Sequence, residues 1–392
     1  MKMTDRFSGG VWAVDFEFHP SNGVEGNPQV PVCMVAHDMT SGQTIRLWRD
    51  ELLKLERAPF PIDGTALLIA YFASAEIGCF LELGWALPVN VVDLYVEFRV
   101  ATNGVPPAHG NGLLGALLHY GVAGGMASDE KADMRELILS QGPWDEEQRL
   151  KIVDYCESDV RSLAKLIPAM LPNIDLSRAI LRGEYMCAVA CIETTGVPID
   201  YDLFCKLHLK WDEIKTDLIL KMDSEFGVFV DGAFKAELFK KYLAAAGMPW
   251  PRISTGKLDL SDDAFREMSR AYPQINSLGE LRGSLSKMRL STLSVSEDGR
   301  NRCLLSPFRS TTGRNQPSTS KFIFGPSTWL RGLIKPAAGY GIAYIDWSQQ
   351  EFGIAAALSN DLSMKKAYAS GDPYLAFAIQ AGAVPADATK QW

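Results

Sequence analysis

Two acidic residues stand two apart in an apolar run near the N-terminus. The run VWAVDFEF has the composition of a β-strand, so Asp15 and Glu17 project from the same face. Two carboxylates on one face of an apolar strand repel each other and lose hydration, and a bound divalent cation offsets both costs. Hard oxygen ligands favour Mg²⁺ or Mn²⁺. A solvated acidic edge stays open as the alternative, because Asp145 and Glu147 repeat the spacing at an expected helix start.

A tyrosine and an aspartate four residues apart lie on the helical pattern DEEQRLKIVDYCESDVRSLAKL. At this spacing Tyr155 and Asp159 share one face of the helix, where a hydroxyl and a carboxylate can act together. Tyr368 and Asp372 have the same spacing elsewhere in the chain. An ordinary amphipathic helix therefore stays open as the alternative for this pair taken alone.

The elements that must position these residues alternate along the first half of the chain. Short β-rich or apolar runs bounded by turn residues predict strands at 11–18, 30–37, 44–50, 65–72 and 89–95. A helical pattern occupies 74–84, and helices dominate 112–170 with breaks at two glycine-containing turns. Strands first, then alternation, then helices are typical of a layered α/β or α+β domain.

The sequence patterns of the second half predict mainly helices up to about residue 290. Helical patterns cover 178–195, 200–245 and 261–290, and a polar stretch follows at 294–320. The run GIAYID then predicts a strand that ends at Asp346, with a helix opening at Ser348. Ser348 and Glu351 also fit the S-x-x-E capping box, so a purely structural interpretation of this segment stays open.

The charge is distributed unevenly. The chain carries −8 overall, but residues 282–335 hold ten Lys or Arg against two acidic residues, a local balance of +8 that leaves −16 elsewhere. Such a basic segment suits phosphate contact, although a solvated basic surface explains it equally well. The seven cysteines contain no CxxC pair, which favours reduced thiols. No apolar run is long enough to span a bilayer and no signal-peptide core is visible, so we expect a cytoplasmic protein.

Together and in order, these acidic motifs resemble the exonuclease motifs of family A DNA polymerases, the Klenow-like enzymes and particularly their phage relatives. The resemblance places Asp15 and Glu17 in the first motif and Tyr155 and Asp159 in the third. It implies an α/β exonuclease domain of the ribonuclease H-like type, a mixed sheet with helices.

The second motif of that family has an aspartate shortly after a strand and a further aspartate seventeen residues later. Glu76 and Asp93 have this separation, so the resemblance puts Glu76 in the catalytic place. Glutamate for aspartate keeps the charge and adds a methylene. Asp93 is the alternative carboxylate for this motif.

The chemistry that the resemblance implies is two-metal hydrolysis of a phosphodiester, with Mg²⁺ or Mn²⁺ as the pair of ions in the active site. Asp15, Glu17 and Asp159 would hold the metals. Glu76 would be an outer or second-site carboxylate. Tyr155 would orient the attacking water or the scissile phosphate through its hydroxyl.

The segment DWSQQE resembles motif A of the same family, usually D-Y-S-Q-I-E-L-R. Asp346 then corresponds to the catalytic aspartate that binds metal for nucleotidyl transfer, and Glu351 to the steric-gate glutamate that excludes ribonucleotides. The sequence departs from the pattern at Trp347, Gln350 and Gly353. None of these departures removes a metal ligand.

The flanking segments agree with this resemblance. STTGRNQPS is similar to the TGR stretch of the family and puts Arg314 at the minor groove of the primer terminus. LRGSLSKMR is similar to the thumb segment, making Arg282 and Lys287 phosphate contacts. The implied partners are primer–template duplex DNA, a single-stranded 3′ end and deoxynucleotides, for a monomeric protein without membrane contact.

The resemblance gives three expected parts: an exonuclease domain at 1–177, a leading helix and thumb region at 178–300, and the start of an α+β palm at 301–392. The sequence ends soon after motif A, before the fingers helix and the second polymerase aspartate of the family. We therefore expect a C-terminally truncated polymerase of a bacterial or phage-infected cell, active as an exonuclease but not in primer extension.

Two other functions compete with this one. An exoribonuclease of the RNase D type would share the first domain, but motif A and the TGR stretch favour a polymerase. A non-catalytic DNA-binding module with a degenerate nuclease fold would not need the four acidic and tyrosine residues of the first and third motifs. Agreement of separate motifs in order and spacing favours the polymerase interpretation.

Overall fold

The computed structural model describes residues 6–21, 27–103, 105–124, 128–287, 290, 293–325 and 328–389. The chain divides into two compact units, Met1–Lys335 and Pro336–Trp392. Residues 301–335, expected to begin the palm, therefore fold with the first unit. The boundary expected at residue 177 lies inside that unit.

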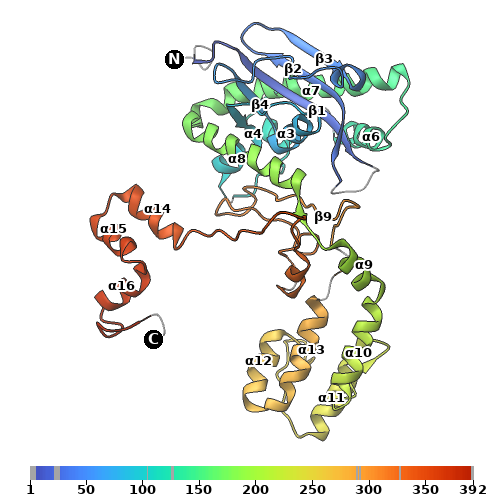
Figure 1. Cartoon of the computed structure of the whole chain (residues 1–392), viewed down its shortest axis with the longest axis vertical. Coiled ribbons are helices and arrows are strands. Elements are labelled where there is room, and N and C mark those ends of the chain that lie inside the picture. Colours follow the sequence, from blue (N-terminus) through green and yellow to red (C-terminus); the bar gives the residue numbers. More distant parts are fainter. Residues whose placement is uncertain are drawn as a thin grey trace. The chain divides into compact units, whose positions relative to one another are not determined.

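A five-stranded mixed sheet forms the centre of the N-terminal part (Figure 1). Its strand order is β3-β2-β1-β4-β5, with antiparallel pairing from β3 to β1 and parallel pairing from β1 to β5. All five strands predicted from the sequence are present, which confirms the layered α/β interpretation. They are β1 (Val11–Pro20), β2 (Gln29–Asp38), β3 (Thr44–Trp48), β4 (Leu67–Ala70) and β5 (Val91–Asp93).

Helices cover both faces of this sheet. They are α2 (Arg49–Leu52), α3 (Ala73–Glu82), α4 (Leu94–Thr102), α5 (Leu113–His119), α6 (Ser128–Leu139), α7 (Glu146–Met170), the short η2 (Leu171–Asn173) and α8 (Leu176–Thr195). Alternate residues of β1 point to opposite faces. Val11 and Ala13 pack in the core that contains α7, whereas Trp12 and Val14 pack in the core that contains α3 and part of α8. Residues 15 and 17 therefore share the α7 face.

The long helix α7 begins with a reciprocal cap. The Asp145 carboxylate accepts a hydrogen bond from the Gln148 backbone N–H at 2.8 Å, and the Gln148 side chain accepts one from the Asp145 N–H at 3.0 Å. This capping box satisfies two amide groups that the helix itself leaves without partners. The acidic triplet at residues 145–147 is thus a helix start, as the sequence indicated.

A mainly helical region follows, with its own aromatic core around Phe239. Its elements are α9 (Tyr201–Leu209), α10 (Trp211–Asp223), β7 (Phe229–Val230), β8 (Ala233–Phe234), α11 (Ala236–Ala245), α12 (Asp262–Ala271), η3 (Pro273–Ile275) and α13 (Asn276–Lys287). The hairpin β7–β8 interrupts a stretch expected to be helical throughout. Asp231 and Gly232 form its two-residue turn, both with positive φ, and an Asp-Gly pair favours this turn type.

The last residues of the first unit, 300–335, pair and pack with residues just before the helical region and at its start. Strand β9 (Arg300–Asn301) pairs with β6 (Val197–Pro198), and η5 (Thr328–Leu333) contributes to the same core. The guanidinium of Arg302 donates to the Thr194 carbonyl at 2.7 Å and pairs with Asp298. These contacts connect residues 300–335 to the C-terminal end of α8.

The second unit contains α14 (Gln350–Ser359), α15 (Leu362–Ala369) and α16 (Pro373–Gln380). The strand predicted at 341–346 is wrong: these residues have no regular secondary structure and are exposed. A strand needs a hydrogen-bonding neighbour, and none pairs with this run among the described residues. The helix begins at Gln350 rather than Ser348, because Gln349 adopts a left-handed conformation, and no capping box forms.

None of the seven cysteines, all within the described residues, takes part in a disulfide bond. Within the described part of the chain, no helix has the length and apolarity required to traverse a bilayer.

A buried ion pair fastens α8 to α4, and its removal should destabilise the fold. The Arg182 guanidinium donates two hydrogen bonds of 2.7 Å to Glu97, whose side chain is 3% exposed. Because Glu97→Ala leaves a largely buried guanidinium without its counter-charge, we expect a loss of about 3–5 kcal/mol in unfolding free energy. Urea denaturation measures it. Glu147→Ala, which breaks an exposed pair with Lys151, should change stability by less than about 1 kcal/mol.

Candidate active site

Strand β1 places two carboxylates on the face covered by α7. The ligand atoms of Asp15, Glu17 and Cys156 all lie within 4.8 Å of one another. The pairing of β1 with β2 shifts register between Glu17 and Phe18, a bulge that bends the strand directly after the second carboxylate. Asp15 and Glu17 are partly exposed, so a ligand can reach them from solvent.

Helix α7 brings the third carboxylate and the tyrosine to this strand. Asp159 is buried, and its charge acts on Asp15 and Glu17 strongly enough to raise the pKa of both. The Cys156 thiol lies one turn earlier and donates to the Asp15 carbonyl at 3.3 Å. Tyr155 is partly buried beside the same carboxylates. The first and third sequence motifs therefore meet, as their resemblance implied.

Glu76 joins the cluster from the first turn of α3. Strand β4 pairs with β1 only from Val11 to Ala13, so the β1 backbone beyond Ala13 lacks a strand neighbour on that side. The Glu76 carboxylate occupies this position and accepts a hydrogen bond of 2.7 Å from the Phe16 N–H. Its side chain is buried, and burial followed by repulsion from Asp15 raises the pKa of Glu76. Glu76 is thus a neighbour of the first-motif carboxylates.

Asp93 has a different environment. Its buried carboxylate accepts hydrogen bonds from four backbone amides at the starts of α3 and α4: Phe72 at 2.9 Å, Ala73 at 2.8 Å, Tyr95 at 2.9 Å and Val96 at 3.4 Å. These bonds hold Phe72 in a left-handed conformation with φ of 70°. Between the two alternatives for the second motif, Glu76 lies at the carboxylate cluster and Asp93 fixes the helix that carries it.

One cation within the cluster was not anticipated from the sequence. The Lys131 ammonium on α6 lies 2.9 Å from both carboxylate oxygens of Asp159. It also stands 5.5 Å from the centre of the Tyr155 ring. The segment SDEKADMREL reads as a solvated charged helix, so no signal in the sequence distinguished this lysine from its neighbours.

The electrostatics of the cluster are unfavourable without a further cation. Burial, then repulsion by Asp159, raises the pKa of Asp15 to about 8. Burial and the neighbouring carboxylates raise the pKa of Glu17 and Glu76 well above the usual range. Burial likewise raises the pKa of Asp159, although Lys131 opposes this. The Lys131 ammonium opposes these shifts only at Asp15 and Asp159.

The donor set fits hard divalent cations. The carboxyl groups of Asp15 and Glu17 lie within 4.8 Å of the Cys156 sulfur, and burial raises the pKa of that cysteine well above 9.0, so that it remains a thiol. Oxygen ligands without thiolate favour Mg²⁺ or Mn²⁺ over zinc. Burial followed by the charge of Asp159 also raises the pKa of the Tyr155 hydroxyl, which therefore stays protonated and can donate a hydrogen bond.

The stability of the metal-free protein should fall as the pH rises. The pKa of Asp15 is about 8 in the folded protein against an ordinary value of 3.8, so the folded state binds this proton more tightly. Its stabilising contribution is complete below about pH 4 and is lost as the pH rises through about 8. We expect the unfolding temperature in EDTA to fall over this interval and Mn²⁺ to remove most of the fall. Equal slopes for wild type and Asp15→Asn would contradict the assignment.

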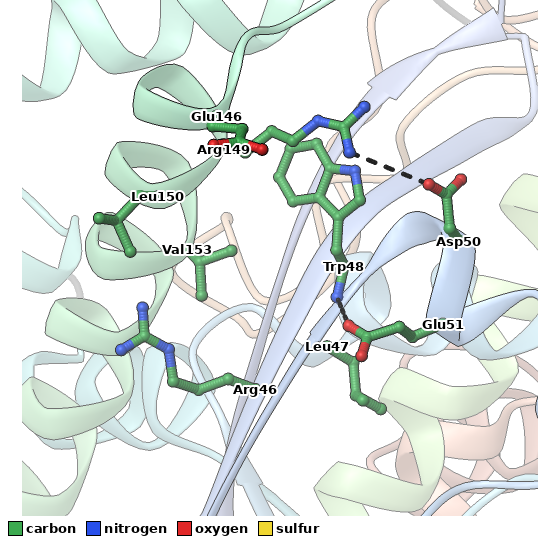
Figure 2. A pocket seen from close by; sticks show the side chains of 9 residues that line it. All are labelled: Arg46, Leu47, Trp48, Asp50, Glu51, Glu146, Arg149, Leu150 and Val153. Atoms are coloured by element: carbon green, nitrogen blue, oxygen red, sulfur yellow. Dashed lines mark hydrogen bonds and ion pairs between the residues drawn. The ribbon is translucent and has the colours of Figure 1, made fainter.

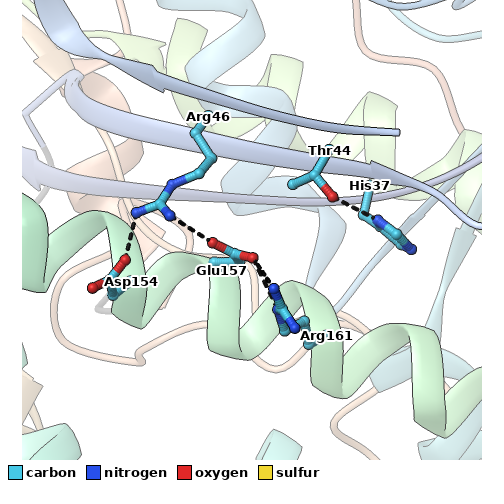
Figure 3. A network of polar contacts seen from close by, with 6 residues as sticks. All are labelled: His37, Thr44, Arg46, Asp154, Glu157 and Arg161. Atoms are coloured by element: carbon cyan, nitrogen blue, oxygen red, sulfur yellow. Dashed lines mark hydrogen bonds and ion pairs between the residues drawn. The ribbon is translucent and has the colours of Figure 1, made fainter. Parts of the chain in front are cut away.

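Ion pairs between β3 and α7 hold the helix that carries Tyr155 and Asp159. Arg46 on β3 pairs with Asp154 and, at 2.9 Å, with Glu157, which also pairs with Arg161 (Figure 3). The network joins β3 to the helix that carries Tyr155 and Asp159.

A surface groove of about 550 Å³ lies next to these ion pairs, between β3, α2 and the first turns of α7. Figure 2 shows the Trp48 ring at its centre, with the Arg149 guanidinium 5.4 Å from the ring centre. Trp144 contacts Trp48 edge-on at 5.8 Å. The residues that line this groove include none of the clustered carboxylates, so it is separate from the site.

The three expected DNA contacts differ in their surroundings. Arg282 lies between the rings of Phe234 and Phe265, 4.5 Å and 4.4 Å from their centres, and donates to the Leu260 carbonyl. This packing gives Arg282 a structural role in the helical core. Arg314 is exposed in a turn closed by Ser310. The side chain of Lys287 lies outside the described residues.

The two motif A residues lie in the second unit. Asp346 is exposed in the irregular segment before α14, and Glu351 is exposed in the first turn of that helix. The Tyr368 hydroxyl donates to the Ser348 carbonyl at 3.0 Å and thereby connects the segment to α15. Within the residues that the structure describes, the clustered metal-ligand atoms are those of Asp15, Glu17 and Cys156, not those of Asp346.

Comparison with known proteins identifies the fold. The chain is similar to a solved structure described as the POL domain of Pol1 from M. smegmatis in complex with DNA primer-template and dNTP. The two share 17% sequence identity and a TM-score of 0.65, over 99% of this chain and 67% of the other. No family model matches the sequence, and no curated protein matches it. The chain thus has a mixed α/β fold of the kind found in a DNA polymerase domain.

Proposed function

We propose that this chain is part of a DNA-directed DNA polymerase of family A whose first domain is a 3′→5′ exonuclease. The observation that carries the proposal is the pair Asp15 and Glu17, whose ligand atoms lie within 4.8 Å of each other, with Glu76 and Asp159 from two further elements close enough for their charges to act on this pair. The likeness to a polymerase domain supports it, as does the order of the motifs. The strand order β3-β2-β1-β4-β5 is compatible with a ribonuclease H-like domain.

The residues of the cluster divide the work of phosphodiester hydrolysis. Asp15, Glu17 and Asp159 hold the divalent ions, with Glu76 as an outer carboxylate. Two Mg²⁺ or Mn²⁺ ions bound there would lower the pKa of the attacking water and offset charge on the departing 3′ oxygen. The Tyr155 hydroxyl, kept protonated by its surroundings, donates a hydrogen bond to the water or to the scissile phosphate.

Polymerase function rests on motif A and the shared fold. Asp346 binds metal for nucleotidyl transfer, and Glu351 crowds the sugar 2′ position of an incoming nucleotide. Arg314 contacts the minor groove at the primer terminus and Lys287 contacts the duplex backbone, whereas Arg282 packs inside the helical region. The proposed partners are primer–template DNA, a single-stranded 3′ end and deoxynucleotides, bound by a monomer in the cytoplasm of a bacterial or phage-infected cell.

A trimming assay tests the exonuclease. Single-stranded DNA and RNA of one sequence, each labelled at the 5′ end, are incubated with the protein in Mg²⁺, Mn²⁺ or EDTA. The proposal expects a metal-dependent ladder of shortened labelled DNA. Preferential trimming of RNA would instead establish an RNase D-type activity, and DNA binding without trimming would establish a non-catalytic module.

A further inference from the structure

Lys131 occupies the position of a cation at the carboxylate cluster. Its ammonium nitrogen is equidistant, at 2.9 Å, from the two oxygens of Asp159. This is the symmetric arrangement that a cation adopts when one carboxylate binds it through both oxygens. Asp159 is buried, so little water competes with the ammonium for this carboxylate.

The charge of Lys131 extends beyond this one contact. It acts on Asp15 as well as on Asp159, so the ammonium partly neutralises two of the carboxylates that would hold a divalent ion. A divalent ion that approaches Asp159 meets an ammonium already at both oxygens and is repelled by its charge. Lysine and metal therefore compete for the same carboxylate.

The surroundings give the ammonium a second contact. It stands 5.5 Å from the centre of the Tyr155 ring, within the range of a cation–π interaction. Lys131 lies on α6, whereas Asp159 and Tyr155 lie on α7, so one long, flexible side chain contacts both groups and can leave them by rotation without a shift of either helix.

We propose that Lys131 is a positioning residue that holds the Asp159 carboxylate in the metal-free protein and is displaced when a divalent ion binds. The inference rests on the proposed function, since it concerns the metal site of the exonuclease. In the absence of metal the lysine stabilises the folded carboxylate cluster. By the same attraction to Asp159 it weakens the binding of a metal ion. Release of Asp159 is thereby coupled to the arrival of the ion.

Titration with Mn²⁺, followed by electron paramagnetic resonance of the free ion, tests this proposal. Lys131→Met and the milder Lys131→Gln are compared with Lys131→Arg, which retains the charge, and with Lys151→Met, which removes an exposed lysine from α7. We expect Met and Gln to tighten Mn²⁺ binding about tenfold. Arg and the Lys151 control should stay within about twofold of wild type.

The thermal stabilisation gained from Mn²⁺ is a second readout, because loss of a purely structural lysine would lower the unfolding temperature equally with and without the ion. Lys131→Met should unfold at a lower temperature than wild type in EDTA and gain more from saturating Mn²⁺. Mn²⁺ binding by wild type without tighter binding in the Met and Gln variants would overturn this inference alone. Absence of Mn²⁺ binding in wild type would overturn both this inference and the proposed exonuclease.

Discussion

Asp15→Asn should reduce Mg²⁺-dependent trimming of single-stranded DNA by about 10³-fold or more. The substitution keeps the shape of the side chain and removes the charge that acts most strongly on Glu17 and Glu76. An amide oxygen is a weaker ligand for a hard cation, and charge stabilisation by bound metal supplies most of the rate in this chemistry. Initial rates on a 5′-labelled oligonucleotide measure the effect.

Two comparisons separate this loss from unfolding. Because burial, and then repulsion by Asp159, disfavours the charged Asp15 side chain in the metal-free protein, Asp15→Asn should raise the unfolding temperature in EDTA by about 2–4 °C, opposite in direction to its effect on activity. Asp154→Asn changes an exposed aspartate of α7 that pairs with Arg46, and should retain activity within about threefold. Trimming by Asp15→Asn within tenfold of wild type would refute the role of Asp15.

Gly183→Ala should destabilise the first unit by about 2–4 kcal/mol. Helix α8 passes so close to β5 that a Cβ at position 183 would lie 1.9 Å from the Val91 carbonyl oxygen. The obstacle is backbone, so no side-chain rotation relieves it and the helix must shift. Chemical denaturation measures the loss, and an unchanged midpoint would contradict the packing of α8 on β5.

A matched glycine provides the control. Gly283 lies in α13, where an added Cβ meets no atom within 4 Å. Gly283→Ala should therefore stabilise the protein by about 0.5–1 kcal/mol through helix propensity. The Gly183 variant should also weaken Mn²⁺ binding, because β5 ends at Asp93, which holds the start of the helix that carries Glu76.

The sheet and the shared face of Asp15 and Glu17 were predictable, because successive side chains of a β-strand point to opposite faces. Val11, Ala13, Asp15 and Glu17 alternate with Trp12 and Val14, and this pattern alone assigns the acidic pair to one face. The helix that carries Tyr155 and Asp159 was predictable from its length and its cap. That the motifs would meet followed from their resemblance to a known set, not from either pattern alone.

Other features depend on tertiary neighbours that no local pattern contains. Lys131 lies in a charged helix, and only the packing of α6 on α7 brings it to Asp159. The choice between Glu76 and Asp93 depends on where β4 stops pairing with β1. The apolar run at 341–346 has the composition of a strand, but composition does not supply the neighbour that a strand requires.

The central claim is that acidic side chains from β1, α3 and α7 bind divalent metal together. Crystals soaked in Mn²⁺ and measured at its absorption edge test it most directly. We predict anomalous density between Asp15, Glu17 and Asp159, and none there in crystals of Asp15→Asn. Density confined to other parts of the molecule, with these three carboxylates free of metal in the wild type, would contradict the account.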